Sequence, residues 1–386
     1  MKPLPLSGVR VIDFSQVMMG PCCTQMLGDY GADIIKIEKE KIGDLSRWSL
    51  GKDPDGHRNP VFSSLNRNKK SVALNLKTES ARAQVLGLLD TADVAVNNFR
   101  PGVMERMGFG YDDLKERNPR LIYAVGTGFG MSGPNSKKGG QDILAQALSG
   151  VMERRADPDH PAAIYPTALC DYSAGMHLVQ GVLLALLQRE KTGEGQIVSV
   201  SLYDSMLAMQ MQEAAVRMMR GRDLNWARFP LTGVFQTTDR SIVMVGAFKV
   251  NPLQDICEAL QIEDLSQLER FSDFERQTEN RAELQRIFRE KFATNSSTHW
   301  LQRLELVDVL CAPVRTLSEA LDDEQTAANG MLVDAGQTPN GPVRVIGSPI
   351  NMSAAPLEIR LPPPMLGEHN ALVLPQHPAS CPETAA

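Results

Sequence analysis

Residues 9–38 read VRVIDFSQVMMGPCCTQMLGDYGADIIKIE, and the order of elements that they predict decides the fold. Apolar residues dominate 9–14, which predicts a strand. Gly20-Pro21 then opens a helix that Gly31 ends. Residues 33–38 predict a second strand. A strand, a helix and another strand in so short a stretch are typical of a parallel sheet.

The same alternation continues along the chain. Further apolar segments predict strands, and amphipathic segments predict helices. The strands are expected at 71–74, 94–96, 121–125 and 197–200, and the helices at 79–90 and 176–188. Methionines between about 203 and 219 predict another helix, buried in the core or at a subunit contact. We therefore expect an α/β fold with a mainly parallel sheet that helices cover on both faces.

The length of 386 residues is about twice that of a typical domain, so either two domains or one large domain with an insertion is expected. A large domain should span 1–222, and a smaller α/β domain should span 223–315. The elements expected in the smaller domain are a strand at 241–245 and helices at 251–260 and 281–293. Residues 316–386 should form a linker and a C-terminal segment that returns to the large domain.

The composition argues against several classes of partner. A net charge of −6 gives no general attraction to nucleic acid or to an anionic membrane. No run approaches the roughly 20 apolar residues that a membrane span needs, and the N-terminus has no signal-peptide core. The six cysteines are scattered, without CxxC pairs or zinc-like spacing to histidine. We therefore expect a reducing, cytoplasmic location and no metal site.

Asp171 is the most informative single residue. It comes just before the apolar run 176–188, at the start of a predicted helix. An aspartate there can cap the helix by accepting bonds from the first backbone N–H groups. The same N–H groups and the helix dipole favour an ionised carboxylate, which can act as a covalent nucleophile. The local sequence leaves both interpretations open.

Two turns that follow predicted strands are candidate ligand sites. Residues 128–133 match G-x-G-x-x-G, but loop residues follow where a dinucleotide site needs a helix. A glycine-rich loop that lets a ligand approach the backbone is the better interpretation. Asn98-Phe99-Arg100 offers an aromatic ring and a cation, which suit an adenine or a phosphate. A plain turn explains these three residues equally well.

Taken together, these segments resemble the family III coenzyme A transferases, a family that includes formyl-CoA transferase, carnitine CoA-transferase and α-methylacyl-CoA racemase. The resemblance covers nearly the whole chain, and the shared order of the segments is more specific than any one of them. The segments that carry it are Leu6–Phe14, Gly20-Pro21, Gly31–Glu38, Gly43–Arg47, Asn66–Ser71, Asn98–Gly102, Asn118–Ala124, Thr192–Gln196 and Leu366–His369.

The resemblance implies roles for individual residues. Asp171 matches the family's nucleophile, which shifts the balance from helix cap to catalyst. The residues that match CoA contacts are Met18, Met19, Lys39, Leu74, Asn75, Leu76, Lys77, Asn98, Phe99, Arg100, Arg106, Lys137 and Lys138. The family also implies a Rossmann-like large domain, a smaller domain and an interlocked homodimer. A CoA thioester would be the substrate, with no permanently bound cofactor.

The resemblance also implies a choice between two reactions. Racemases need a histidine in a Gly-His-Asp segment as a second acid/base group, and this chain has Gly140-Gln141-Asp142. Glutamine cannot exchange a proton near neutral pH. We therefore expect a CoA transferase that moves CoA from an acyl-CoA donor to a small carboxylic acid through aspartyl anhydride and aspartyl-CoA thioester intermediates. Gln141, Asp142 and Arg47 should orient the substrate, and Arg47 would suit a dicarboxylic acid. A racemase and a non-catalytic CoA-binding protein are the alternatives.

Overall fold

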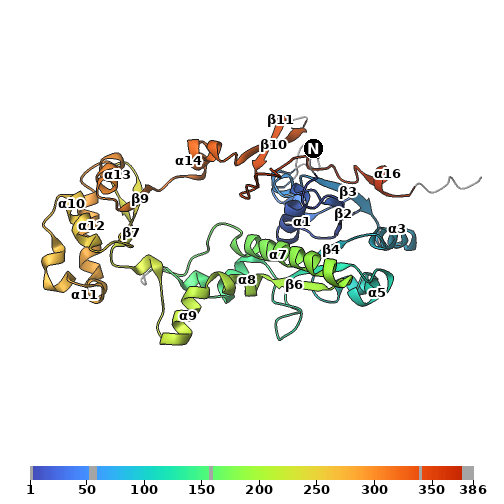
Figure 1. Ribbon diagram of the computed structural model, residues 1–386, viewed down its shortest axis with the longest axis horizontal. Coiled ribbons are helices and arrows are strands. Elements are labelled where there is room, and N and C mark those ends of the chain that lie inside the picture. The colour runs from blue at the N-terminus through green and yellow to red at the C-terminus, as the bar shows by residue number, and fades with distance from the viewer. Residues whose placement is uncertain (1–2, 52–58, 156–159, 339–340, 376–386) are drawn as a thin grey trace, which may run out of the picture. The chain divides into compact units, whose positions relative to one another are not determined.

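The computed structural model describes residues 3–51, 59–155, 160–338 and 341–375. The chain divides into two compact units (Figure 1). Unit 1 is made of residues 1–151, 164–210 and 325–386, and unit 2 of residues 152–163 and 211–324. Unit 2 is therefore an insertion in the chain of unit 1. Residues 376–386 of the expected C-terminal segment, with Cys381, lie outside the described residues.

Unit 1 is built on one sheet of six parallel strands in the order β3-β2-β1-β4-β5-β6. The strands are β1 (Arg10–Asp13), β2 (Asp33–Lys39), β3 (Lys69–Leu74), β4 (Val94–Asn97), β5 (Ile122–Thr127) and β6 (Ile197–Ser201). The expected α/β architecture with a parallel sheet is confirmed. The sheet order is that of doubly wound nucleotide-binding folds.

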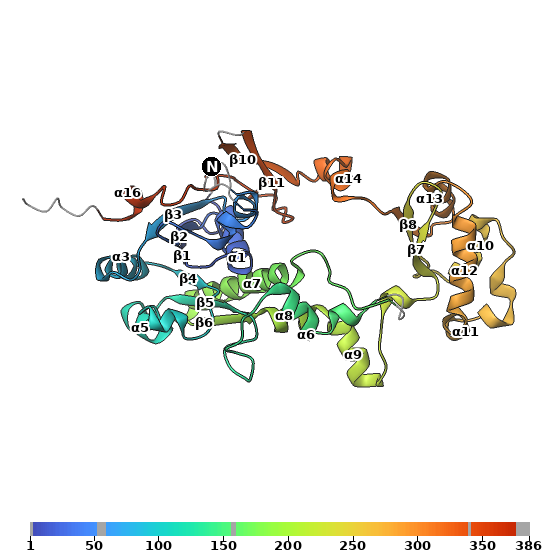
Figure 2. The ribbon, with the colours of Figure 1, turned by 180° about the vertical axis from the view of Figure 1, so that it is seen from behind.

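Helices cover both faces of this sheet (Figures 1 and 2). The helices of unit 1 are α1 (Met19–Asp29), α2 (Pro60–Ser63), α3 (Glu79–Leu89), α4 (Val103–Arg106), α5 (Tyr111–Arg117), α6 (Asp142–Leu148), α7 (Leu169–Thr192), α8 (Leu202–Met209) and α16 (Asn370–Val373). In the central strand, Val11 packs in a core with α1 and α7, while Ile12 packs in a core with α3, α4 and α5. Both side chains are fully buried, as a strand covered on both faces requires.

The sequence predicted no segment that is long and apolar enough to span a membrane, and the long helix α7 corrects that expectation. By length and composition alone it could cross a membrane, and it is the one helix among the described residues that could. The burial of its side chains is instead that of a helix with one face packed against a sheet. Leu178 and Val182 are fully buried against the sheet, whereas Leu184 and Leu187 are 66% and 64% exposed. One such helix is weak evidence for a membrane span, because the core helix of a globular unit passes the same test.

The methionine-rich segment does not form one buried helix. Helix α8 ends at Met209, and a separate helix, α9 (Met211–Arg220), follows it in unit 2. Gln210 interrupts the run, because its side chain donates to the carbonyls of Ser149 and Met206, both at 3.1 Å. No residue of α9 is buried. The prediction of a single helix, and of burial in the core for its second half, is therefore wrong.

The C-terminal part of unit 1 covers an edge of the sheet. A hairpin of β10 (Leu332–Thr338) and β11 (Gly341–Ile346) precedes it. The backbone N–H groups of Gly367 and His369 donate to the hydroxyl and the carbonyl oxygen of Ser71, at 2.9 and 3.0 Å. One residue later, Asn370 exchanges two bonds with the backbone of Ala73. These bonds occupy the outer edge of β3, which would otherwise be open to pairing with another chain.

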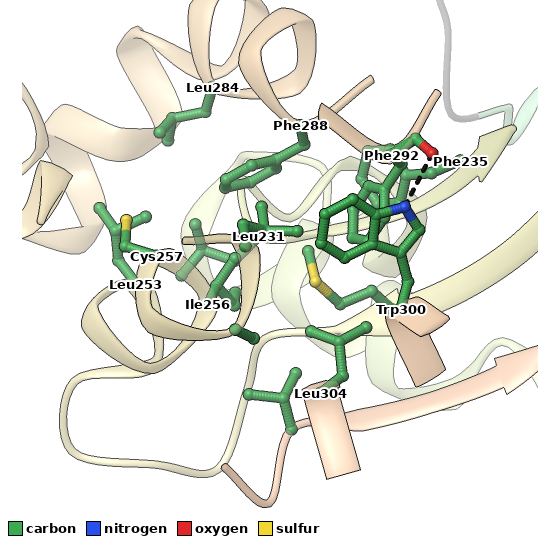
Figure 3. Close-up of a cluster of buried hydrophobic side chains, with 14 of the residues drawn as sticks. Leu231, Phe235, Leu253, Ile256, Cys257, Leu284, Phe288, Phe292, Trp300 and Leu304 are labelled. Carbon is green, nitrogen blue, oxygen red and sulfur yellow. Dashed lines mark hydrogen bonds between the residues drawn. The ribbon is translucent and has the colours of Figure 1, made fainter. Parts of the chain in front are cut away.

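Unit 2 has an antiparallel sheet in the order β7-β8-β9 and its own apolar core (Figure 3). Its elements are β7 (Thr232–Gln236), β8 (Ser241–Val245), β9 (Leu310–Pro313), α9, α10 (Pro252–Leu260), α11 (Phe274–Glu279), α12 (Arg281–Phe292), α13 (Ser297–Leu306) and α14 (Leu317–Leu321), and α15 (Glu324–Ala328) lies at its boundary with unit 1. Trp300 is central to the core. Its indole N–H donates to the carbonyl of Phe292 at 2.9 Å, and the two rings meet edge to face.

One buried ion pair fastens the C-terminal segment to the sheet of unit 1. The guanidinium of Arg47 donates to both carboxylate oxygens of Glu38, at 2.8 and 2.7 Å, and both side chains are buried. It also donates to the carbonyl of Pro364 at 3.2 Å and lies 3.6 Å above the ring of Phe62. This guanidinium is thus bonded to Glu38 and Pro364 and stacked on Phe62, all residues of unit 1.

Replacing Arg47 should therefore destabilise the fold. We expect Arg47→Met to lower the free energy of unfolding by about 3–5 kcal/mol, because it leaves the Glu38 carboxylate buried without its cation. Urea denaturation followed by circular dichroism measures the change. The matched control is Arg117→Met, which breaks a half-exposed pair with Asp90 and should cost at most about 1 kcal/mol. Equal losses for the two variants would contradict this account.

Candidate active site

The candidate site lies where the chain connections of the parallel sheet diverge. β1 pairs with β2 on one side and with β4 on the other, so the loops that leave the carboxyl ends of β1 and β4 run in opposite directions. In open parallel sheets, ligands bind in the crevice at such a point. The loops at this crevice are residues 14–18 and 98–101.

Two cavities open at this edge of the sheet. The first has a volume of about 330 Å³, and the second has a volume of about 370 Å³. Gln16 and Phe99 line both cavities, so the two adjoin. Each is of a size that takes part of a small-molecule ligand.

The two cavities collect most of the residues predicted from the sequence. Those lining the first cavity are Met18, Met19, Asn98, Phe99, Arg100, Lys138, Gln141 and Asp171. Those lining the second cavity are Lys39, Leu74, Asn75, Leu76, Lys77 and Phe99. Residues from four loops, from the ends of β2 and β3 and from the starts of α1 and α7 are thus brought to one edge of the sheet.

Four of the predicted residues line neither cavity. Arg106 is exposed on α4, next to Met107 of the second cavity, and Lys137 is exposed next to Lys138 of the first. Arg47 and Asp142 are instead buried, and the expectation that they orient the substrate is corrected. Arg47 is held by Glu38 as described above, and the Asp142 carboxylate is bonded to backbone N–H groups.

A network of buried charges holds the loop after β1 in place. The ammonium of Lys36 donates to the carbonyl of Ser15 at 2.6 Å and lies 2.9 Å from the carboxylate of Asp44. Asp44 in turn accepts the backbone N–H of Val17 at 3.0 Å. Burial is the largest single influence on the pKa of Asp44 and would raise it, but the charge of Lys36 and the hydrogen bonds from Lys36, Ser46 and Val17 together outweigh burial and lower that pKa to about 2. Asp44 therefore stays ionised and bonded to the loop.

The neighbouring loop, residues 98–101, also holds the loop after β1 in place through hydrogen bonds. Asn98 accepts the backbone N–H of Gln16 at 2.9 Å and donates to its carbonyl at 2.8 Å. Within the loop that these bonds hold, Val17 has a φ of 66°, a left-handed conformation that a β-branched residue rarely adopts. Such strain persists only where the surroundings enforce it, and it is concentrated at functional sites.

Sequence reasoning missed several residues that line the first cavity. These are Gln16, Val17, Leu45, Pro101, Gly126, Thr127, Ser136 and Leu202. Gly128, which opens the predicted glycine-rich loop directly after β5, also lines this cavity, as does Gly140. A Cβ on Gly128 would overlap the Cα of Gly140, so two loops can meet here only if both residues lack side chains. The glycine-rich loop thus forms part of the cavity wall.

The structure revises the expected role of Asp171 in its helix. Helix α7 begins at Leu169, and its N-cap residue, Ala168, makes no side-chain capping bond. The first N–H groups are satisfied from another helix: Asp142 of α6 accepts those of Cys170 and Asp171, at 2.7 and 2.9 Å. Of the two interpretations that the sequence left open for Asp171, the structure does not show the helix cap. Its carboxylate lines the first cavity.

The electrostatics of Asp171 also differ from expectation. Burial, and secondly the charge of Asp142, raise the pKa of Asp171 to about 6, against one lowering contact from the backbone N–H of Met19. The expected lowering of this pKa by the helix terminus is absent, because Asp142 occupies the terminal N–H groups. Asp171 is still mainly ionised at neutral pH and is more basic than a free aspartate.

The nearby thiols do not compete as nucleophiles at neutral pH. Burial raises the pKa of Cys22 to about 11 and that of Cys170 to about 12. Both therefore remain protonated, and a thiol is a much weaker nucleophile than a thiolate. Within the described part of the chain, no three His, Cys, Asp or Glu side chains are grouped so that they could hold a metal ion.

Comparison with known proteins agrees with this geometry. Residues 6–370 match CoA-transferase family III. The chain is 34% identical over 389 residues to the probable fatty acyl-CoA transferase Rv3272 of Mycobacterium tuberculosis, covering 96% of this chain and 97% of that protein. It is 31% identical over 379 residues to the succinyl-CoA:glutarate CoA-transferase of Homo sapiens, covering 96% and 85% respectively.

A solved structure supports the same relationship. A CAIB/BAIF family protein from Brucella suis matches with a TM-score of 0.85 at 30% identity, covering 96% of this chain and 98% of that one. Sequence and fold thus agree over nearly the whole length, and the chain belongs to CoA-transferase family III and is a CoA transferase.

Proposed function

We propose that this enzyme moves CoA from an acyl-CoA donor to a small carboxylic acid, with Asp171 as the covalent nucleophile. The observation that carries the proposal is the environment of Asp171. Its carboxylate lines a cavity, while the N–H groups that would otherwise engage it bond Asp142 instead. A carboxylate that is not bonded to these N–H groups and is ionised at neutral pH is available to attack an electrophilic carbon.

The second cavity is the proposed site for the adenosine end of CoA. Its wall is largely apolar, with Leu74, Leu76 and Phe99 among its lining residues, which suits the faces of a purine ring. Lys39 and Lys77 are exposed at its rim, where they can meet phosphates. The pantetheine arm would then pass Gln16 and Phe99 into the first cavity, where the thioester reaches Asp171.

The first half of the reaction loads CoA onto the enzyme. An oxygen of Asp171 attacks the thioester carbon, the C–S bond breaks, and CoA leaves as a thiolate from an acyl–aspartyl anhydride. The thiolate then attacks the aspartyl carbonyl. The C–O bond of the anhydride breaks, the donor acid leaves as a carboxylate, and Asp171 becomes a thioester of CoA. No proton is gained or lost in either step.

The second half repeats these steps in reverse order. The acceptor carboxylate attacks the aspartyl-CoA thioester and releases the thiolate, which then attacks the acceptor carbonyl of the new anhydride and regenerates Asp171. Each attack places negative charge on a carbonyl oxygen. The backbone N–H groups of Gly139 and Gly140 and the amide of Gln141 are the proposed donors to that oxygen.

Gln141 favours transfer over racemisation. It lies in the wall of the first cavity with Asp171, at the position where a racemase needs its second proton-exchanging group. An amide can orient a substrate by hydrogen bonding but cannot remove a proton from the carbon next to the thioester. Incubating a 2-methylacyl-CoA with the enzyme in deuterium oxide, without an acceptor acid, tests the point. Incorporation of deuterium at that carbon would favour the racemase.

The relatives named above act on acids of different kinds, a fatty acyl group in one and the dicarboxylates succinate and glutarate in the other. We propose a small carboxylic acid for this chain because the first cavity, at about 330 Å³, must seat both the thioester end and the acceptor. Mass spectrometry of new thioesters, formed from acetyl-, succinyl- or lauroyl-CoA with a panel of mono- and dicarboxylates, identifies the pair.

We also propose that the enzyme acts in the cytoplasm as an interlocked homodimer. Each unit carries exposed apolar side chains that a second subunit could cover. In unit 1 these include Leu184 and Leu187 of α7, and in unit 2 Met218 and Met219 of α9. Large exposed apolar residues gathered on one helix are typical of contact surfaces. Sedimentation equilibrium decides between a monomer and a dimer.

Asp171→Asn should abolish transfer without unfolding the enzyme. Because Asp142 supplies the helix cap, the loss of the Asp171 charge leaves the start of α7 intact. We expect kcat to fall at least roughly 10³-fold, as it does when a covalent nucleophile is removed. The control is Asp112→Asn, the same change at a highly exposed position of α5, which should leave kcat unchanged.

Mass spectrometry of the wild type during turnover gives a second reading. The intermediate should be found as CoA attached to the peptide that contains Asp171, and hydroxylamine should convert it to the hydroxamate. Attachment to Cys170 instead, or full activity of Asp171→Asn, would overturn the assignment.

The raised pKa of Asp171 predicts a linked pH dependence of rate and stability. Since only the ionised form attacks, kcat should fall as pH drops through about 6. A folded-state pKa above the unfolded value of 3.8 means that ionising Asp171 destabilises the fold above pH 6 and not below about pH 4. At pH 7, Asp171→Asn should therefore be more stable than the wild type, by on the order of 2 kcal/mol, and the difference should shrink toward pH 4 and vanish well below pH 3.8. A constant difference across this range would contradict the shift.

Lys39 and Lys77, at the rim of the second cavity, should contact only the phosphate groups of CoA and not its pantetheine arm. We expect Lys39→Met and Lys77→Met each to raise the Kd for CoA about fivefold, since an exposed ion contact contributes up to ~1 kcal/mol. Isothermal titration calorimetry measures this. Competition by pantetheine, which has no phosphate, should be unchanged. Lys115→Met, on the exposed surface of α5, is the control. An equal effect on pantetheine would place the lysines elsewhere along the ligand.

A further inference from the structure

We propose that Asp142 is a positioning residue that caps α7 in place of Asp171 and so leaves the Asp171 carboxylate free for covalent catalysis. The inference rests on the proposed function and deepens it, because it assigns a second carboxylate to the same site. Asp142 itself is buried and does not line the cavity, so it acts through Asp171 rather than on the substrate.

The geometry at the start of α7 carries this proposal. A helix leaves its first backbone N–H groups without partners, and a nearby side chain usually accepts them. In α7 the residue before the helix, Ala168, cannot do so. One oxygen of Asp142, 29 positions earlier in the chain, accepts the N–H groups of both Cys170 and Asp171. A carboxylate from α6 thus does the work that a polar side chain at position 168 would do in an ordinary helix.

The Asp142 carboxylate is itself held firmly. Its other oxygen accepts a bond from the side chain of Gln146, one turn further along α6, at 2.6 Å. Gln146 also accepts the N–H of Tyr165 at 3.1 Å and lies 3.3 Å from the carbonyl of Thr167. Asp142 and Gln146 therefore fasten the segment that leads into α7 to α6, and the position of Asp171 follows from that attachment.

The capping of α7 by Asp142 has a chemical consequence for Asp171. A buried anion beside Asp171 opposes its ionisation and makes its carboxylate more basic. The groups that face Asp171 are Asp142 on α6, the Met19 N–H and Cys22 on α1, and Cys170 on α7 itself. Both thiols are protonated at neutral pH, so Asp142 is the charged neighbour that matters.

Greater basicity helps the step that follows the first attack. In the acyl–aspartyl anhydride, the CoA thiolate can expel either the donor acid or Asp171. The weaker base is the better leaving group. Simple carboxylic acids have pKa values near those of free aspartate and glutamate, about 4, so a more basic Asp171 favours release of the donor acid. The charge of Asp142 thereby directs the anhydride intermediate toward aspartyl-CoA rather than back to the acyl-CoA substrate.

Two variants of the full-length enzyme separate the charge of Asp142 from its capping bond. Asp142→Asn keeps an oxygen that can accept both N–H groups but removes the charge and the acceptor of the Gln146 side chain, and Asp142→Ala removes the charge and both acceptors. The primary measurement is the titration of Asp171 by NMR of enzyme labelled with ¹³C at the aspartate carboxyl group, with the signal assigned from Asp171→Asn. It needs no substrate, so it does not depend on the proposed reaction.

We expect the pKa of Asp171 to fall in Asp142→Asn from about 6 toward 3.8, without reaching it because burial remains. The acid limb of kcat, measured with the donor and acceptor found in the screen, should move to lower pH by the same interval, with KM for the acyl-CoA unchanged. Asp142→Ala should also lower the thermal midpoint, and Asn should restore it. An Asp171 titration that stays at its wild-type position in Asp142→Asn would overturn the inference.

A matched control removes a helix cap elsewhere. Ser296 caps α13 in unit 2 by accepting the N–H of His299 at 3.3 Å. Ser296→Ala should lower the thermal midpoint and leave the Asp171 titration and kcat unchanged. If instead the NMR titration moves as expected in Asp142→Asn while the rate profile does not, the inference about Asp142 stands and the assignment of Asp171 as nucleophile fails.

Discussion

A buried ammonium group, that of Lys36, holds the open end of the parallel sheet together. It bonds the loop after β1 directly through Ser15 and indirectly through Asp44. A buried charge is costly to leave without a partner, so this arrangement has little freedom to shift. The rigidity explains how Val17 can be kept in a left-handed conformation next to the cavity. Without that support the loop would relax, and the crevice that the strand order creates would lose one wall.

The site also shows how a fold can accept a local loss of stability. Asp171 is buried beside a second carboxylate, an arrangement that disfavours its ionised form. Hydrogen bonds nearby compensate for this cost. Asp142 accepts the backbone N–H groups at the start of α7, and the side chain of Gln146 donates a hydrogen bond to Asp142. Local rules that fail at one residue while its surroundings obey them mark functional sites. Here the rule that fails is that the residue before a helix supplies its capping bond, since Ala168 supplies none.

Much of the fold and part of the site could be predicted from the sequence. Alternating strands and helices gave the parallel sheet, because burial on both faces demands runs of apolar residues. The order of the segments pointed to the family, and with it to most residues of the two cavities. The failures have physical causes. Nothing near Asp142 or Arg47 in the sequence reveals that Asp142 is buried against the start of α7 or that Arg47 is bonded to Pro364. The break at Gln210 depends on Ser149, sixty-one positions away.

The edge of β3 is closed by residues 367–370, which follow the whole of unit 2 in the chain. On the ribosome they therefore emerge after unit 2. Until then the sheet of unit 1 presents an open strand edge, which is the kind of surface that pairs with a neighbouring nascent chain. The newborn polypeptide thus carries this risk of misassembly throughout the synthesis of unit 2, and residues 367–370 end it.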